Sequence, residues 1–85
     1  MKFSPPDGFL IYLGDMKKGE YFHWLSFGRD RWIVGAINRV RDLDGVDIEI
    51  LYDSTGHLEG NTFTFMPRTA VRGLTPLEAL AWATK

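Results

Sequence analysis

A nucleophile with an adjacent base would be sought first at the two histidines of this chain, since it contains no cysteine. A nucleophile needs an adjacent base, and neither Ser26 nor Ser54 lies in a sequence context that supplies one. His23 falls within an aromatic-rich segment and is expected to be a partly buried strand residue. His57 falls in a turn-like segment and is expected to be solvated. The sequence therefore predicts no enzyme and no catalytic residue.

Carboxylates form two closely spaced pairs near the centre of the chain: Asp42 with Asp44, and Asp47 with Glu49. Such pairs could serve acid–base catalysis, because alternate residues of an extended strand lie on one side. A structural interpretation is favoured, in which the first pair forms a turn and the second faces Arg41 and Arg39 across a hairpin. A metal site needs about three or four converging ligands, and isolated histidines with scattered carboxylates lack that spacing. We expect no metal and no cofactor.

Basic and aromatic side chains are interleaved in two parts of the chain, as in small barrels that stack single-stranded nucleic acid beside a positive groove. The residues concerned are Lys17, Lys18, Arg29, Arg31, Arg68 and Arg72, with Trp24, Phe27 and Trp32. The formal net charge of −1 and the neighbouring Asp15, Glu20 and Asp30 oppose this interpretation. Nucleic-acid binding is therefore the alternative function.

The segment from Phe27 to Trp32 is the preferred contact region for a protein partner, because Trp and Arg frequently anchor interfaces. Together with an adjacent basic loop, it provides the candidate contact residues Phe27, Arg29, Arg31, Trp32, Lys17 and Lys18. A simple polar turn over residues 28–31 explains the same segment equally well. A cage around a cationic side chain is less favoured, since most aromatics of a small domain belong to its core. Its members would be Trp24, Phe27, Trp32 and Tyr52.

The elements that position these residues are expected to belong to one folded domain spanning residues 1–85. Hydrophobic residues make up 45% of the chain and charged residues 25%, which is typical of a soluble globule rather than a disordered tail. Residues 1–8 lack the apolar run of a signal peptide, and no segment approaches the roughly 20 apolar residues that span a bilayer. Because no cysteine calls for an oxidising compartment, the expected localisation is cytoplasmic, without membrane binding.

Short apolar runs separated by Gly and Pro predict antiparallel strands. The runs are Phe9 to Leu13, Glu20 to Phe27, Arg31 to Arg41, Val46 to Asp53 and Asn61 to Met66, with one more short strand at Thr69 to Arg72. The third and fourth form a hairpin around a three-residue loop that ends at Gly45, where a positive φ is needed. Pairing Asp42 with Val46 places Asn38 on the face toward the core and Ile37 on the solvent-exposed face.

The C-terminal segment contains the parts of a helix start: Thr75 as N-cap, Pro76 at the first helical position and Glu78 bonding back to the cap. A helix from Pro76 to about Thr84 is expected to dock through Leu77, Leu80 and Ala81. The predicted fold is mainly β, a small SH3-like or Tudor-like partly open barrel of about five antiparallel strands with a short C-terminal helix.

These features favour a non-enzymatic protein-interaction module, an adaptor or inhibitor that occupies the surface of a partner protein. A phage or mobile-element source is one version of this hypothesis. An edge strand such as Phe9 to Leu13 could also pair with its own copy to form a homodimer.

Overall fold

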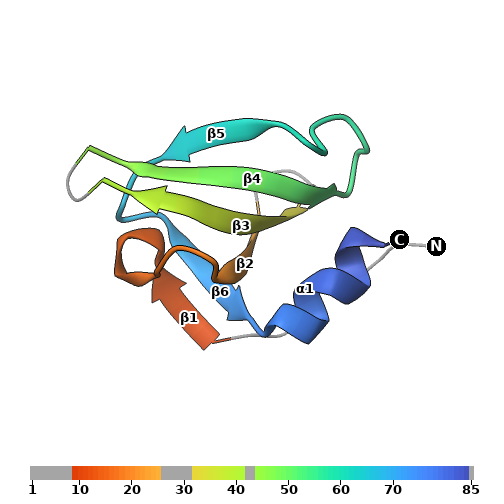
Figure 1. Cartoon of the computed structure of the whole chain (residues 1–85), viewed down its shortest axis with the longest axis horizontal. Coiled ribbons are helices and arrows are strands. Elements are labelled where there is room, and N and C mark those ends of the chain that lie inside the picture. The colour runs from red at the N-terminus through yellow and green to blue at the C-terminus, as the bar shows by residue number, and fades with distance from the viewer. Residues whose placement is uncertain (1–8, 26–31, 42–43, 85) are drawn as a thin grey trace.

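Strands dominate the described part of the chain, and a single α-helix follows them (Figure 1). The computed structural model describes residues 9–25, 32–41 and 44–84. In chain order its elements are β1 (Phe9–Tyr12), the 3-10 helix η1 (Leu13–Asp15), β2 (Tyr21–Leu25), β3 (Trp32–Val40), β4 (Val46–Asp53), β5 (Thr62–Phe65), β6 (Ala70–Leu74) and α1 (Pro76–Ala83). The described strands and α1 thus lie where the sequence predicts them, to within a few residues, whereas η1 was not predicted.

All pairs of neighbouring strands are antiparallel, and together they form one sheet in the order β1-β6-β2-β3-β4-β5. β1 and β5 are the two edges and do not pair with each other, so the sheet is open. The expected mainly β fold with a C-terminal helix is confirmed, although the described residues form six strands and the predicted barrel had about five. The short strand predicted at Thr69 to Arg72 is β6 (Ala70–Leu74), which lies between β1 and β2 and pairs with both. The open sheet does not establish the SH3-like barrel.

One face of the sheet encloses the main hydrophobic core, which we call the inner cluster. Its buried members are Leu13, Met16, Phe22, Ile33, Ile37, Val46, Ile48, Ile50 and Val71, and Ile11, Trp24, Val40, Leu58 and Phe65 pack against them. Because all the described strands contribute to this cluster, the sheet must curl around it rather than lie flat. The N–H of Leu13 donates to the C=O of Thr69 (3.0 Å), which holds the end of β1 against the turn between β5 and β6.

Phe22 is the largest fully buried side chain, and it lies opposite a glycine on each neighbouring strand. It pairs with Gly35 of β3 and with Gly73 of β6. A Cβ atom on Gly35 would lie 2.7 Å from Cζ of Phe22, well inside the contact distance of two carbon atoms. Gly35 therefore makes room for the ring at the most crowded point of the inner cluster.

The β3–β4 hairpin forms where the sequence predicts it, and Gly45 has the expected positive φ, at 140°. Its register is different, because Val40 and not Asp42 pairs with Val46. The connection is longer than the predicted loop and is closed by the N–H of Arg41, which donates to the C=O of Gly45 (2.9 Å). Next to the turn, at Val46 and Asp47, the predicted register was wrong by two residues, a shift that by itself does not turn a strand over.

Two β-bulges in this hairpin change which side chains face the core. Asn38 has no partner in the ladder; it is exposed, and Ile37 enters the inner cluster. The prediction had these two residues the other way round, but burying an apolar side chain is favourable and burying an unpartnered amide is not. On β4, Leu51 lacks a ladder partner in the same way, so Tyr52 lies on the opposite face from Ile50.

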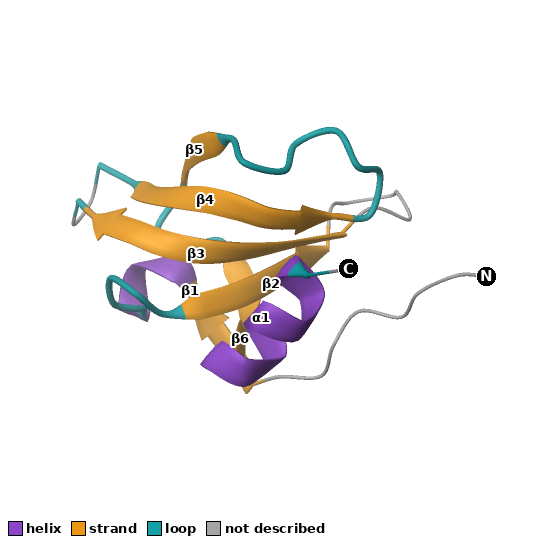
Figure 2. Cartoon of the chain, turned by 45° about the vertical axis from the view of Figure 1, so that its right-hand side comes forward, coloured by secondary structure: helices purple, strands orange, loops and turns teal. Residues whose placement is uncertain are grey.

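The helix α1 lies against the other face of the sheet (Figure 2). A second core, the outer cluster, lies beneath this helix. Its buried members are Trp32, Val34, Tyr52, Leu74 and Ala79, with Tyr21 and Trp82 packed against them. Alternation along a strand separates the two clusters, since Ile33 of β3 belongs to the inner one and both of its neighbours belong to the outer one. The ring of Trp82 meets that of Trp32 edge to face, with centroids 4.5 Å apart.

The helix α1 begins as the sequence predicts. The hydroxyl of Thr75 accepts a hydrogen bond from the N–H of Glu78 (3.2 Å), and Oε1 of Glu78 accepts one from the N–H of Thr75 (3.1 Å). This reciprocal capping box satisfies two N–H groups that the first turn of a helix otherwise leaves without partners.

The face through which α1 docks is not the predicted one. Ala79 is buried and Trp82 half-buried against the sheet, whereas Leu77, Leu80 and Ala81 are exposed. The docking prediction was wrong because an indole ring buries more apolar surface than a leucine. Ala79, one turn before, is small enough to let the helix approach the sheet closely.

Candidate functional site

The structure describes only half of the residues predicted to contact a partner. Lys17 and Lys18 are exposed in the turn before β2, whereas Trp32 is 3% exposed and belongs to the outer cluster. The remaining predicted contacts, Phe27, Arg29 and Arg31, lie outside the described residues. The side chain of Trp32 packs beneath α1 and offers almost no surface to a partner.

The basic turn and Trp32 lie at opposite ends of β2. At one end the N–H of Gly19 donates to the C=O of Ile37 (2.9 Å), and at the other end Leu25 pairs with Trp32. The length of the strand therefore separates the two parts of the predicted contact region, so the described residues do not form one continuous surface.

A shallow hollow of about 560 Å³ lies beside the basic turn. It is lined by Met16, Lys17, Lys18, Asn38, Arg39 and Val40. The N–H of Lys17 donates to Oε1 of Glu20 (2.6 Å), which orders the turn on one side of this hollow. Three of its side chains are cationic, so it is suited to an anionic group such as a phosphate or a carboxylate.

The aromatic residues considered for a cationic cage are divided between the two faces of the sheet. Trp24 packs at the rim of the inner cluster, with its ring centroid 5.1 Å from that of Phe65. Trp32 and Tyr52 contact each other in the outer cluster, with centroids 5.2 Å apart. Because the sheet lies between Trp24 and the other two rings, the described members do not converge on one cation.

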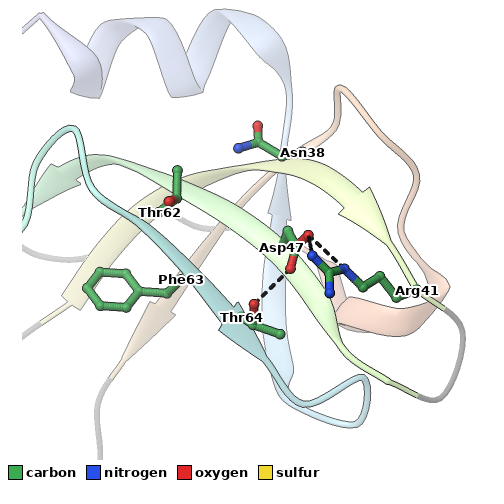
Figure 3. A pocket seen from close by; sticks show the side chains of 6 residues that line it. All are labelled: Asn38, Arg41, Asp47, Thr62, Phe63 and Thr64. Atoms are coloured by element: carbon green, nitrogen blue, oxygen red, sulfur yellow. Dashed lines mark hydrogen bonds and ion pairs between the residues drawn. The ribbon is translucent and has the colours of Figure 1, made fainter.

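A second hollow, of about 520 Å³, lies along β3, β4 and β5 (Figure 3). It is lined by Asn38, Arg41, Asp47, Thr62, Phe63 and Thr64. Nη2 of Arg41 lies 2.7 Å from Oδ2 of Asp47, and the hydroxyl of Thr64 donates to Oδ1 of the same carboxylate at 2.7 Å. Arg41 thus forms the expected ion pair with Asp47, but the predicted ladder partners were wrong, because Arg39 lies opposite Asp47 and Ala36 lies opposite Glu49.

The environment of Asp47 determines what this second hollow can do. The hydrogen bond from Thr64, followed by the hydrogen bond and charge of Arg41, lowers the pKa of Asp47 against the opposing effect of burial. Asp47 is therefore ionised at neutral pH and accepts hydrogen bonds without donating any. A general acid needs the opposite shift, so this hollow is suited to holding polar groups rather than to proton transfer.

The two histidines lie in different elements of the fold. His23 is buried on β2, where its ring approaches that of Trp32 edge to face at 6.3 Å, and His57 is exposed in the turn after β4. Both positions match the sequence expectations. Within residues 9–25, 32–41 and 44–84, no three His, Asp or Glu side chains gather as a metal site would require.

Asp53 is a buried carboxylate that the sequence analysis did not single out. It accepts hydrogen bonds from the N–H groups of Thr55 (3.1 Å) and Leu58 (2.9 Å), and from the hydroxyl of Thr55 (2.9 Å). These bonds organise the turn between β4 and β5, so the role of Asp53 is structural. The Asp-Ser-Thr-Gly sequence at this point is the signal that could have predicted it.

The outward face of α1 exposes two large apolar side chains to solvent. Leu77 is 80% exposed and Leu80 is 54% exposed. With Ala81 they follow the spacing of three and four residues that puts side chains on one side of a helix. The sequence predicts this stripe but places it against the core. The signal for the true docking face was Trp82, one turn after the small Ala79.

Comparison with protein families, curated proteins and solved structures finds no significant match to this chain. None of the helices in the described ranges is long and apolar enough to cross a membrane. The functional interpretation therefore depends on the geometry of the chain itself.

Proposed function

We propose that this chain is a non-enzymatic protein-interaction module, an adaptor or inhibitor that occupies a groove of a partner protein with the outward face of α1. The exposure of Leu77 and Leu80 carries this proposal. A surface helix normally turns its apolar stripe toward the core, whereas α1 docks through Ala79 and Trp82 and leaves both leucines in water.

The helix α1 is already ordered in the free chain. An isolated helix of eight residues is unstable in water, but α1 is capped by Thr75 and Glu78 and held on the sheet by Trp82. A partner therefore does not have to supply the free energy for ordering it. Residues at positions i, i+3 and i+4 are the contacts through which amphipathic helices bind apolar grooves. The partner is accordingly a protein with a narrow apolar groove.

The curled sheet has the role of a rigid platform in this proposal. We propose that the sheet is related to the small SH3-like or Tudor-like barrels and differs from a closed barrel in that its two edge strands do not pair. We further propose that the chain acts in the cytoplasm. Such a platform can hold the short helix α1 in a constant orientation on its outer face.

The test is capture from a cell lysate by immobilised wild-type chain, followed by affinity measurement with the captured protein. Replacing both Leu77 and Leu80 by Ser should weaken binding at least about 30-fold, because buried apolar anchors each contribute about 1–2 kcal/mol or more. The matched control replaces Lys17 and Lys18 by Ser, which is the same number of changes on another surface, and should bind like the wild type. Circular dichroism must show that both variants are folded. Unchanged affinity of the leucine variant would contradict the proposal.

Nucleic-acid binding is the second candidate, and the hollow lined by Lys17, Lys18 and Arg39 favours it. It predicts that capture is abolished by nuclease and falls steeply with salt. The lysine variant should then lose binding while the leucine variant keeps it, which reverses the pattern expected for a protein partner.

A further inference from the structure

The strand β5 is an edge of the sheet that lacks two of the features that usually protect an edge from pairing. Its four residues, Thr-Phe-Thr-Phe, carry no charge and no proline. Charged residues, prolines and bulges are the usual means by which proteins prevent edge strands from associating. Phe63 is 39% exposed on this strand, so part of an aromatic ring faces water there.

The hydrogen bonds at the start of β5 determine which of its backbone groups are available. The N–H of Gly60 donates to the C=O of Ile50 (2.9 Å), and the N–H of Ile50 donates to the C=O of Asn61 (2.9 Å). Hydrogen-bonded and non-bonded pairs alternate along an antiparallel ladder. Asn61 is bonded to Ile50, so the next bonded pair lies two residues further along each strand. That pair is Phe63 with Ile48.

It follows that the residues between the bonded pairs direct their N–H and C=O groups away from β4. In the described strand these residues are Thr62 and Thr64. Their main-chain groups lie along the open edge, ready to pair with another strand.

We propose that β5 pairs antiparallel with β5 of a second copy of this chain, with Phe63 on the two-fold axis. This arrangement places Thr62 opposite Thr64 of the second copy, and the reverse, so the outward groups of both residues exchange backbone hydrogen bonds. The two Phe63 rings meet in the close, non-bonded position between them, where cross-strand aromatic pairs form. The two open sheets become one continuous sheet.

The sequence of the edge favours its own copy over an unrelated strand. Thr62-Phe63-Thr64 reads the same in both directions, so an antiparallel two-fold matches like residues on each face. The flanking charges are opposite in sign, with Glu59 before the strand and Arg68 after it. Antiparallel pairing brings the acidic flank of one copy toward the basic flank of the other. This surface is separate from the leucine face of α1, and the dimer does not depend on the proposed function.

The oligomeric state of the intact chain tests this assignment, measured by sedimentation velocity from about 1 µM to 1 mM. The wild type should dimerise, and Thr62→Pro should raise the dimer dissociation constant about 30-fold, because each copy loses an intermolecular hydrogen bond. The N–H of Thr62 does not bond to β4, so proline is tolerated there as it is on other edges. The matched control at the opposite edge, Leu10→Lys on β1, should dimerise like the wild type. Circular dichroism verifies the folding of each variant.

A charge exchange at the two-fold axis gives an independent measurement. Phe63→Lys and Phe63→Glu should each be monomeric, because like charges face each other, and an equimolar mixture should form a heterodimer. Recovery in the mixture distinguishes a lost interface from a misfolded variant. A wild-type chain that remains monomeric at 1 mM, a dimer dissociated by Leu10→Lys but not by Thr62→Pro, or a mixture that stays monomeric would each overturn the proposal.

Discussion

The inner and outer clusters lie on opposite faces of the same sheet but are built differently. The inner cluster is mostly aliphatic and draws on all the described strands, so many elements hold each of its side chains. The outer cluster is centred on Trp32 and Tyr52 and is covered by one helix of eight residues. The inner cluster therefore decides whether the sheet forms, and the outer cluster decides whether α1 stays docked on it.

This difference separates stability from presentation of the candidate interface. A short helix attached through few side chains can open locally while the rest of the sheet remains folded. The orientation of Leu77 and Leu80 therefore depends on Trp82 and its two aromatic neighbours, rather than on the larger core. The following variants test how independent the two clusters are.

Phe22→Ala should have the largest effect, because it removes the largest fully buried side chain of the inner cluster. We expect it to lower the free energy of unfolding by about 3–5 kcal/mol, which is a large part of the stability of a small domain. Chemical denaturation followed by circular dichroism measures this loss. A loss below about 1 kcal/mol would mean that the inner cluster is not the main source of stability.

Trp82→Ala should have roughly half that effect, because the indole of Trp82 is only half-buried. Its ring centroid lies 4.5 Å from that of Trp32 and 5.3 Å from that of Tyr52. Hydrogen exchange should show loss of protection in α1 while β3 and β4 remain protected. Leu77→Ala is the control on the outward face and should change stability by less than about 0.5 kcal/mol. Equal loss of protection in β3 and β4 would indicate that the two clusters unfold as one unit.

Glu78→Ala should destabilise the chain less than Phe22→Ala and Trp82→Ala do, and its effect should depend on pH. The hydrogen bond from the N–H of Thr75, followed by that from its hydroxyl, lowers the pKa of Glu78. A lowered pKa means that the contribution is complete above the unfolded value of about 4.3 and is lost as pH falls through the folded value. The difference in thermal midpoint between Glu78→Ala and wild type should therefore be greatest at neutral pH and shrink below about pH 4.

Glu78→Gln is the corresponding control, because glutamine also completes a capping box but does not titrate. The thermal midpoint of Glu78→Gln should lack the fall at acid pH that protonation of Glu78 causes in the wild type. A difference between Glu78→Ala and wild type that is the same at pH 3 and pH 7 would contradict the assigned role of the carboxylate.

Local patterns predicted much of the fold because the relevant interactions connect residues close together in sequence. The capping box joins Thr75 to Glu78, and the hairpin turn depends on the positive φ of Gly45. The register of that hairpin could not be predicted in the same way. It depends on bulges at Asn38 and Leu51, which become favourable only when the inner and outer clusters compete for neighbouring side chains.

The candidate interface likewise has features that the local sequence predicts and features that long-range packing decides. The stripe of Leu77, Leu80 and Ala81 is visible in the sequence, but its direction is decided by whether the sheet offers a better site for Trp82. Likewise, the uncharged segment Thr62–Phe65 can be read directly, whereas its position at an edge follows from the order of all the strands.

The sequence by itself determined that this chain forms short antiparallel strands and a capped C-terminal helix, because strand alternation, turn residues and capping are local properties. Only the tertiary structure decided which helix face meets the sheet, which strands remain at its edges and which aromatic rings are buried. These outcomes depend on packing between residues far apart in sequence, where the same apolar side chain can serve either as core or as surface.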